Sequence, residues 1–514
     1  DNYNIDITKY FGFNWNTVHY TALNGNPYFY KGQTVFQVTD GYYTSLLNNI
    51  DNADSGGGKL VSLTGYNKLI HGDVTYSSWN NSHTLSRILV TTSNGYVLGA
   101  GENAGGWLNR GNTTDVRDKL IVIYDPNDYS GDKCIKARLN GTAVSGGAGV
   151  TTLYVLTESG KILTCGDNAN GKLGIGTTTD STTFVQSQDT SGLATGFVDF
   201  ETSTGSATTT AIAVKSNGTW WAVGDGTTEI TGNGNSTTDR LVWTQISELP
   251  TKAYKKFLIS SSDTKANCLI LYQDGDLYGA GDNASGILGN GNVTSVFTYQ
   301  LVRTGVSNFF ISCIEEETTP TVWTIESGNI FCCGEAGRNQ CLQNNTTDQT
   351  TYVQETAIPS GFVVTENDIW GSTTCTANYE GAFFFRAYNP TTGEYRLYAV
   401  GYNAFYQFGN NTTTSTSTSL ANITSYLPIN PKEIHFMDWS GGSTTVYGGV
   451  SWLVTKKGEL FATGDIWGHN NLASASIAYS SAYNHFPFCS NGEQDRQQVW
   501  ERVWLTQASA GDNA

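Results

Sequence analysis

Charged residues are scarce in this chain of 514 residues: they make up 14% of it, and the formal net charge is −17. A protein that binds nucleic acid needs basic patches against the phosphates, so this balance argues against nucleic acid as a partner. The same negative charge argues against docking on anionic lipid. The sequence also lacks any run of about 18 apolar residues, so no segment is predicted to span a membrane.

The motifs of common catalytic and metal sites are missing as well. The glycine-rich stretch before Lys59 lacks the first P-loop glycine, which Ala53 replaces, and Leu60 stands where that motif needs Ser or Thr. No G-x-S-x-G nucleophile elbow occurs. The six histidines have neither H-x-H nor H-E-x-x-H spacing, and Ala53 occupies the third position of the best calcium-loop candidate. We therefore expect no enzyme, no cofactor and no metal.

Nine cysteines are present, an odd number whose spacing matches neither a disulfide framework nor a zinc site. Cys165 and Cys333 occupy the same position in a repeat, where the other copies carry Ala, Val or Thr. We interpret both as small core residues.

What the sequence does contain is one pattern repeated seven times. It is clearest at Gly160–Gly176, GKILTCGDNANGKLGIG: a glycine turn, a short strand, an anchor glycine, an acid, an amide and a glycine-rich loop. The seven anchor glycines are Gly101, Gly166, Gly224, Gly281, Gly334, Gly401 and Gly464. Six copies have a further glycine six residues before the anchor, where the sixth copy has Tyr395. Seven copies indicate a repeat architecture.

Each repeat predicts short strands joined by tight turns. Asn94-Gly95, Asn217-Gly218 and Asp274-Gly275 are typical of hairpin turns in which both central residues need φ above zero. One such sheet cannot bury both of its faces alone, whereas seven sheets arranged radially bury them against each other. We predict an all-β fold, a seven-bladed β-propeller over residues 71–514, with units of about 63 residues.

Residues 1–70 do not carry the repeat clearly and are predicted to form an N-terminal extension that docks to a partner or helps to close the ring. The alternating segment 34–38 predicts a strand there, and residues 51–59 predict a loop or linker. The chain opens at Asp1 without a signal-peptide pattern, which leaves open whether a leader or a longer segment precedes it.

The repeat resembles that of the regulator of chromosome condensation family. The pattern G-x-[IVL]-[aromatic or aliphatic]-x-x-G-[DE]-N-x-x-G-x-L-G-x-G is best kept at 160–176 and 275–291, nearly as well at 95–111, and decays in the other copies. The resemblance covers about six-sevenths of the chain and implies a propeller. It implies little about function, because the family includes a nuclear exchange factor, photoreceptors and a secreted β-lactamase inhibitor. The chain has no basic tail for chromatin, which argues against the exchange-factor function.

Loop aromatics are the best candidates for a binding surface, with packing between blades as the competing interpretation. The candidates are Trp107, Tyr402, Phe405, Tyr406 and Trp467. The adjacent Trp220 and Trp221 are expected to pack within the sheets on opposite faces. The acids that follow the anchors are expected to hold loop amides rather than to catalyse a reaction. They are Glu102, Asp167, Asp225, Asp282, Glu335 and Asp465.

Three functional hypotheses follow. The first is a non-enzymatic virion surface protein, such as a tail or head fibre or a decoration protein, that uses propeller loops to recognise other virion proteins or a host-surface glycan or protein. A homo-oligomer is one form that such an assembly could take. The second is a secreted binding module or enzyme inhibitor. The third is a glycan-active enzyme with paired carboxylates from different blades.

Overall fold

The computed structural model describes residues 87–140, 151–203, 209–261, 265–311, 320–371, 382–440 and 450–464 with short gaps inside these ranges, and strands within 18–37, 69–73 and 497–502. These residues form β-strands and five short 3-10 helices. The latter are η1 (Pro126–Tyr129), η2 (Ala169–Gly171), η3 (Glu229–Thr231), η4 (Thr424–Tyr426) and η5 (Pro431–Glu433). No helix in this part of the chain is long and apolar enough to cross a membrane.

Seven antiparallel sheets, called blades 1 to 7 in chain order, confirm the predicted propeller. Blade 1 consists of β4 (Leu69–Asp73), β5 (Arg87–Thr92), β6 (Val97–Gly101) and β7 (Val116–Tyr124). Blade 2 consists of β8 (Cys134–Asn140), β9 (Thr152–Thr157), β10 (Ile162–Gly166) and β11 (Ser181–Gln186). Blade 3 consists of β14 (Phe197–Thr202), β15 (Thr210–Lys215), β16 (Trp220–Gly224) and β17 (Arg240–Ile246). A small hairpin, β12 (Gln188–Asp189) and β13 (Gly192–Leu193), extends blade 3 at its outer edge.

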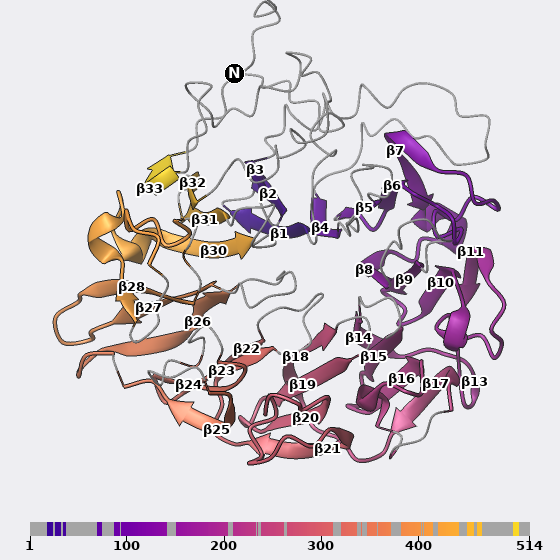
Figure 1. Ribbon diagram of the computed structural model, residues 1–514. Helices are drawn as coiled ribbons and strands as arrows, with labels where there is room; N and C mark the ends of the chain where they lie inside the picture. Colours follow the sequence, from indigo (N-terminus) through magenta and orange to yellow (C-terminus); the bar gives the residue numbers. More distant parts are fainter. Residues whose placement is uncertain are drawn as a thin grey trace, which may run out of the picture.

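The remaining blades repeat the same order of four strands. Blade 4 consists of β18 (Tyr254–Ser261), β19 (Ala266–Tyr272), β20 (Leu277–Gly281) and β21 (Val296–Arg303), and blade 5 of β22 (Asn308–Ile311), β23 (Thr321–Glu326), β24 (Asn329–Gly334) and β25 (Gln349–Gln354). Blade 6 consists of β26 (Val363–Gly371), β27 (Ala382–Tyr388), β28 (Tyr395–Gly401) and β29 (Ala421–Asn422). Blade 7 consists of β30 (Ile434–Ser440), β31 (Val450–Thr455), β32 (Leu460–Gly464) and β33 (Gln497–Arg502). The first strand of each blade lies nearest the axis of the ring and the last strand lies outside (Figure 1).

The N-terminal region contributes a separate three-stranded sheet. Its strands are β1 (Val18–Leu23), β2 (Asn26–Lys31) and β3 (Thr34–Gln37), and β3 confirms the strand expected at 34–38. β1 lies beside β4, the inner strand of blade 1, and the sheet stands between blade 7 and blade 1 (Figure 1). This position is the one that a ring-closing segment would take. The division of the chain at residue 70 stays a prediction.

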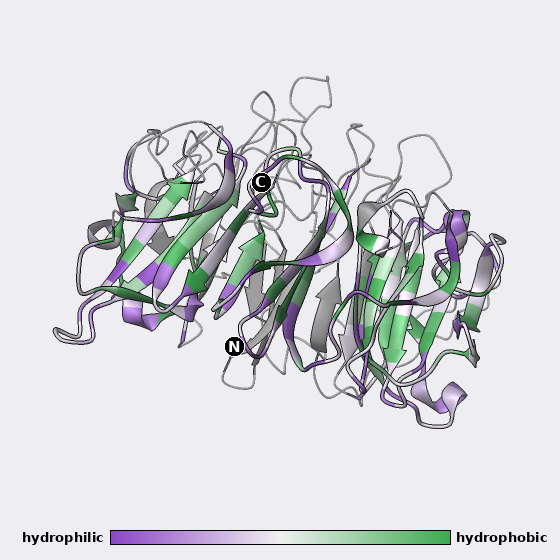
Figure 2. Cartoon of the chain, turned by 90° about the horizontal axis from the view of Figure 1, so that it is seen from below, coloured by the Kyte–Doolittle hydropathy of each residue, from purple (hydrophilic) through white to green (hydrophobic). Residues whose placement is uncertain are grey.

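Hydrophobic clusters lie between neighbouring blades. Hydrophobic residues follow the strands of each sheet (Figure 2), and each cluster takes its members from two adjacent blades. Trp220 packs in the cluster between blades 3 and 4, and Trp221 packs in the cluster between blades 2 and 3. Both side chains are buried, as expected for neighbours on one strand, because successive side chains point to opposite faces.

The anchor glycine is required by a close backbone approach. All seven anchors have φ between 101° and 128°, a region that favours glycine. A Cβ at Gly166 would lie 2.2 Å from the carbonyl oxygen of Thr151, which instead accepts a hydrogen bond from Asp167 N at 2.9 Å. At Gly224 the corresponding distance to the Thr209 oxygen would be 2.1 Å. The repeat therefore marks the point where the third strand leaves the sheet.

The hairpin turns differ from the prediction at most positions. Gly95, Gly160, Gly218 and Gly275 each have positive φ, whereas Asn217 and Asp274 before two of them do not. Gly275 N donates to Tyr272 O, three residues earlier, at 3.1 Å. This pattern is a three-residue turn that ends in a left-handed glycine, so the expected pair of positive φ values was wrong there. Among the described turns of this kind, only the turn in blade 5 has two successive residues with positive φ, Ser327 and Gly328.

Candidate functional site

Trp107 is not a surface aromatic, which corrects the expectation from its loop position. Its side chain is fully buried between blades 1 and 2, and its indole Nε1 donates to Glu102 O at 2.5 Å. The same repeat position is buried in four other blades, by Lys172, Ile230, Ile287 and Gln407. The position points into the joint between blades, so packing there decides the residue's role.

Tyr406 is the one other predicted loop aromatic among the described residues. It is half-buried with φ of 64°, and its carbonyl oxygen accepts from Thr463 Oγ1 at 3.0 Å across to blade 7. The three remaining candidates, Tyr402, Phe405 and Trp467, lie outside the described residues. A binding surface made of these aromatics stays a prediction.

The post-anchor loops are held by their own acids and amides. In blade 2, Asn168 Nδ2 donates to Thr177 O and Thr179 O at 2.8 and 2.9 Å, and Asn168 N donates to Asp180 Oδ1 at 2.8 Å. Asp167 Oδ1 accepts from Ala169 N at 3.1 Å. The expected loop-holding role of the acid is confirmed in four blades. The equivalent bonds are made by Glu102, Asp225 and Asp282 to the amides of Ala104, Thr227 and Ala284.

The loops of blades 1 to 4 are also hydrogen-bonded to the next blade. Gly176 N donates to Leu241 O on β17 at 2.8 Å, and Gly291 N donates to Thr350 O on β25 at 2.7 Å. Cys165 Sγ lies 3.2 Å from Trp107 O, and Cys333 Sγ lies 3.1 Å from Ile287 O. Both thiols are buried, which confirms their core role and places them at joints between blades.

Charged side chains meet on the inner strands of blades 2 to 4, and we call them the inner-strand network. Lys136 Nζ lies 2.7 Å from Asp199 Oδ1 and 2.6 Å from Glu201 Oε1. Arg138 Nε lies 3.3 Å from Glu201 Oε2, and the Tyr254 hydroxyl donates to Asp199 Oδ2 at 3.2 Å. Burial raises the pKa of Glu201, but Lys136 and Arg138 outweigh it and hold that pKa below its usual value. Glu201 is therefore a fixed anion and a poor general acid.

Two further lysines extend from β18. Lys256 Nζ donates to Phe309 O at 2.8 Å and lies 5.2 Å from the centre of the Phe309 ring. Burial lowers the pKa of Lys256 to about 8. The adjacent Lys255 forms an ion pair with Glu366 of blade 6, past the short inner strand of blade 5.

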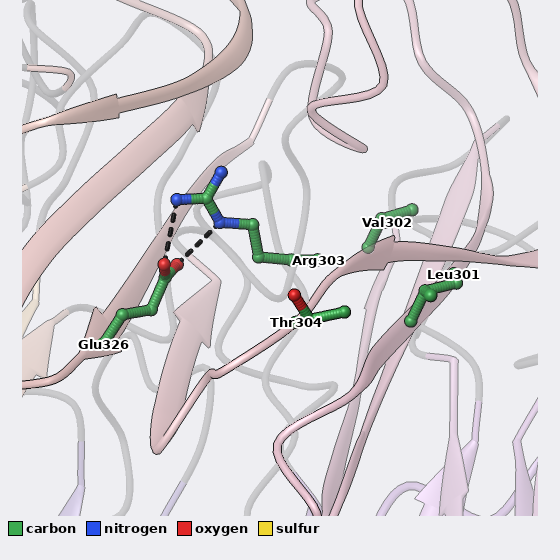
Figure 3. Close-up of a pocket in the computed structure, with 5 residues that line it drawn as sticks. All are labelled: Leu301, Val302, Arg303, Thr304 and Glu326. Atoms are coloured by element: carbon green, nitrogen blue, oxygen red, sulfur yellow. Dashed lines mark hydrogen bonds and ion pairs between the residues drawn. The ribbon is translucent and has the colours of Figure 1, made fainter.

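A surface cavity of about 460 Å³ lies at the joint between blades 4 and 5 (Figure 3). It is lined by Leu301, Val302, Arg303, Thr304 and Glu326. The first three come from the end of β21 and Glu326 ends β23. The register of β21 shifts at Val302, because Leu277 pairs with Arg303 and Tyr278 pairs with Leu301. Such a bulge re-aims the side chains next to it.

Arg303 and Glu326 form the polar wall of this cavity. Arg303 Nε and Nη2 each donate to one carboxylate oxygen of Glu326 at 2.8 Å. The guanidinium carbon lies 4.8 Å from the centre of the Phe331 ring and 5.2 Å from that of Tyr352. The hydrogen bonds to Glu326 raise the pKa of Arg303. Sequence reasoning missed this pair because its members are 23 residues apart on different blades, at positions that the repeat does not mark.

Comparisons with known proteins found structural neighbours of low sequence identity. No model of a protein family matches the sequence, and no curated protein sequence matches it. Among solved structures, human WBSCR16 is 17% identical over 68% of this chain and 82% of its own, with a TM-score of 0.43. Prp20p from Saccharomyces cerevisiae is 13% identical over 85% and 93%, with a TM-score of 0.45. Yeast RCC1 (Prp20) bound to Kap60 is 13% identical over 72% and 78%, with a TM-score of 0.44.

The TM-scores of these three neighbours are all below 0.5, too low to establish a shared fold. The resemblance to the regulator of chromosome condensation family rests on the repeat and on the seven sheets. At these identities the likeness carries no function.

Proposed function

We propose that this chain is a non-enzymatic recognition protein on the surface of a virion, where its propeller presents loops to other surface proteins or to a host-surface group. The observation that carries the proposal is the fixing of the loops. In each of the best-kept repeats, the acid and amide after the anchor hold their own loop, and the loop is bonded to the next blade. Loops fixed on a rigid scaffold are suited to recognition.

The cysteines favour a particle assembled inside a cell over the second candidate, a secreted module. Six cysteines in the described part of the chain are buried free thiols: Cys134, Cys165, Cys268, Cys332, Cys333 and Cys341. Disulfides are the usual state of cysteine pairs in secreted proteins, whereas reduced thiols are usual where glutathione is present. The polar, weakly charged composition is also in keeping with fibre proteins.

Electron microscopy of the native source material, labelled with antibody against this chain, tests the proposal. We expect label on virions or on their appendages, and we expect the same antibody to reduce adsorption if the chain contacts the host. Label restricted to soluble material or to cells would contradict the virion assignment.

A further inference from the structure

We propose that the cavity at the joint of blades 4 and 5 binds an uncharged saccharide, with Arg303 and Glu326 as its hydrogen-bonding pair and Leu301 as its apolar wall. This inference rests on the proposed role in surface recognition and names a ligand class and a site for it. The volume of about 460 Å³ falls within the range of roughly 300–1,000 Å³ that small-molecule sites occupy.

The guanidinium of Arg303 is held in place before any ligand arrives. Two of its nitrogens bond to Glu326, and its face lies over two aromatic rings. Glu326 Oε1 also accepts from Thr324 Oγ1 at 2.8 Å. The third nitrogen, Nη1, makes no hydrogen bond to the residues drawn in Figure 3. A donor fixed in this way loses little conformational entropy when it binds, which favours affinity.

The charges of the wall select an uncharged ligand. Glu326 neutralises Arg303, so the pair presents donors and acceptors side by side with no net charge. The chain as a whole carries −17, which repels anions. A sugar hydroxyl can accept from the guanidinium and donate to the carboxylate at the same time. This match favours neutral sugars over sialylated or phosphorylated ones.

An apolar side chain completes the site. Leu301 lines the same cavity as the polar pair and is 48% exposed, although leucine is usually buried. A pyranose ring carries C–H groups on one face, and burial of such apolar surface against Leu301 and Val302 is favourable. A peptide could use the same polar groups and could also pair with β21, which is the outer edge strand of blade 4. Peptide binding is therefore the competing outcome of the test.

The experiment applies the purified full chain to an array of immobilised neutral and sialylated glycans. We expect binding to a set of neutral glycans, a loss of about tenfold in affinity for Arg303→Lys, and a loss of several-fold for Leu301→Ala. Leu301→Ala removes a half-exposed side chain, so it tests the site even if the Arg303 variant folds poorly. Thermal unfolding of each variant checks the fold.

A second arginine pair supplies the matched control. Arg396 bonds to Glu394 at 2.7 Å and lies 4.4 Å from the centre of the Phe362 ring, but it does not line the cavity. Arg396→Lys should leave glycan binding unchanged. The proposal is wrong if no neutral glycan binds, if sialylated glycans or peptides bind better, or if both lysine variants behave alike.

Failure of this proposal and failure of the virion assignment give different results. Labelled virions together with a silent array would leave the virion assignment standing and remove the saccharide site. Neutral-glycan binding that Arg303→Lys weakens about tenfold, with label absent from virions, would leave the saccharide site standing and remove the virion assignment.

Discussion

Lys136 and Lys256 occupy equivalent positions in blades 2 and 4, but their ammonium groups have different partners. Lys136 on β8 and Lys256 on β18 each follow a register shift at the start of the inner strand. Each lies over a phenylalanine of the next blade, at 5.5 Å from the Phe200 ring and 5.2 Å from the Phe309 ring. The backbone position is thus repeated, and the differences come from the neighbouring blade.

The neighbour supplies a carboxylate in one case and an amide in the other. Asp199 Oδ1 lies 2.7 Å from Lys136 Nζ, whereas Asn308 Oδ1 lies 3.4 Å from Lys256 Nζ. Asp199 and Asn308 are equivalent, because each Oδ1 also accepts from the following amide at 2.8 Å.

Lys136 also lies 2.6 Å from Glu201 Oε1, where the equivalent residue of blade 5 is Phe310. Two carboxylates therefore separate a paired ammonium group from one whose pKa falls to about 8. Five predictions, on three variants and the wild-type chain, follow from this comparison.

The largest effect is expected from Glu201→Gln. The variant keeps the shape of the side chain but removes the charge that both Lys136 and Arg138 contact. Lys136 and Arg138 are partly buried, and each would lose a negatively charged partner. The free energy of unfolding at pH 7, measured with urea, should therefore fall by about 2 kcal/mol. Glu158→Gln, in an exposed turn, is the control and should be nearly neutral.

The pH dependence of the same variant has a definite sign. The pKa of Glu201 is lower in the folded protein than in the unfolded chain. Its contribution to stability is therefore present above the unfolded pKa and is lost as pH falls through the folded pKa. Glu201→Gln should remove this acid-side loss, and an unchanged acid profile would contradict the assignment.

A smaller effect is expected from Asn308→Asp, which gives Lys256 one of the two carboxylates that Lys136 contacts. The pKa of Lys256 should rise by about one unit, equivalent to about 1.4 kcal/mol. The readout is the pH dependence of amine labelling at Lys256, followed by mass spectrometry, with Lys255 as the internal control. Stability is a poorer readout, because the variant also loses the bond from Asn308 Nδ2 to Glu366 O.

The wild-type chain provides the reference for this titration. Since the folded pKa of Lys256 is about 8 and its ordinary value is 10.5, the unfolded chain binds more protons between these values. The contribution of Lys256 to stability should therefore increase as the pH rises from about 8 to 10.5. Labelling of Lys256 with a midpoint near 10.5 would overturn the comparison.

The smallest effect is expected from Glu366→Gln. Its ion pair with Lys255 joins blades 4 and 6, but the two side chains are 45% and 32% exposed. Pairs this exposed contribute about 0.5 kcal/mol or less and are screened by salt. We expect a change of that size at low ionic strength and none at 1 M salt. A loss of stability as large as that of Glu201→Gln would show that solvent exposure does not determine how much each ion pair contributes.

The sequence predicted the structure best at the positions that recur in every repeat. Gly166 and its equivalents were recognisable because a single backbone conformation recurs in every blade and excludes side chains. The loop-holding role of Asp167 was predictable for the same reason, since both partners lie within one repeat. Trp107 was misplaced because a loop position alone does not say which way a side chain points, and here it points into the next joint.

By itself the sequence determined the number of blades, the position of each hairpin and the need for glycine at each anchor. All of these depend on local conformation that the repeat copies. The tertiary structure alone decided which charges meet, which lysine lacks a carboxylate, and where Arg303 and Glu326 line a surface cavity. Those features arise between blades from residues that are far apart in the chain and differ from copy to copy. A repeat conserves position, whereas the chemistry of each joint depends on which two side chains the ring brings together.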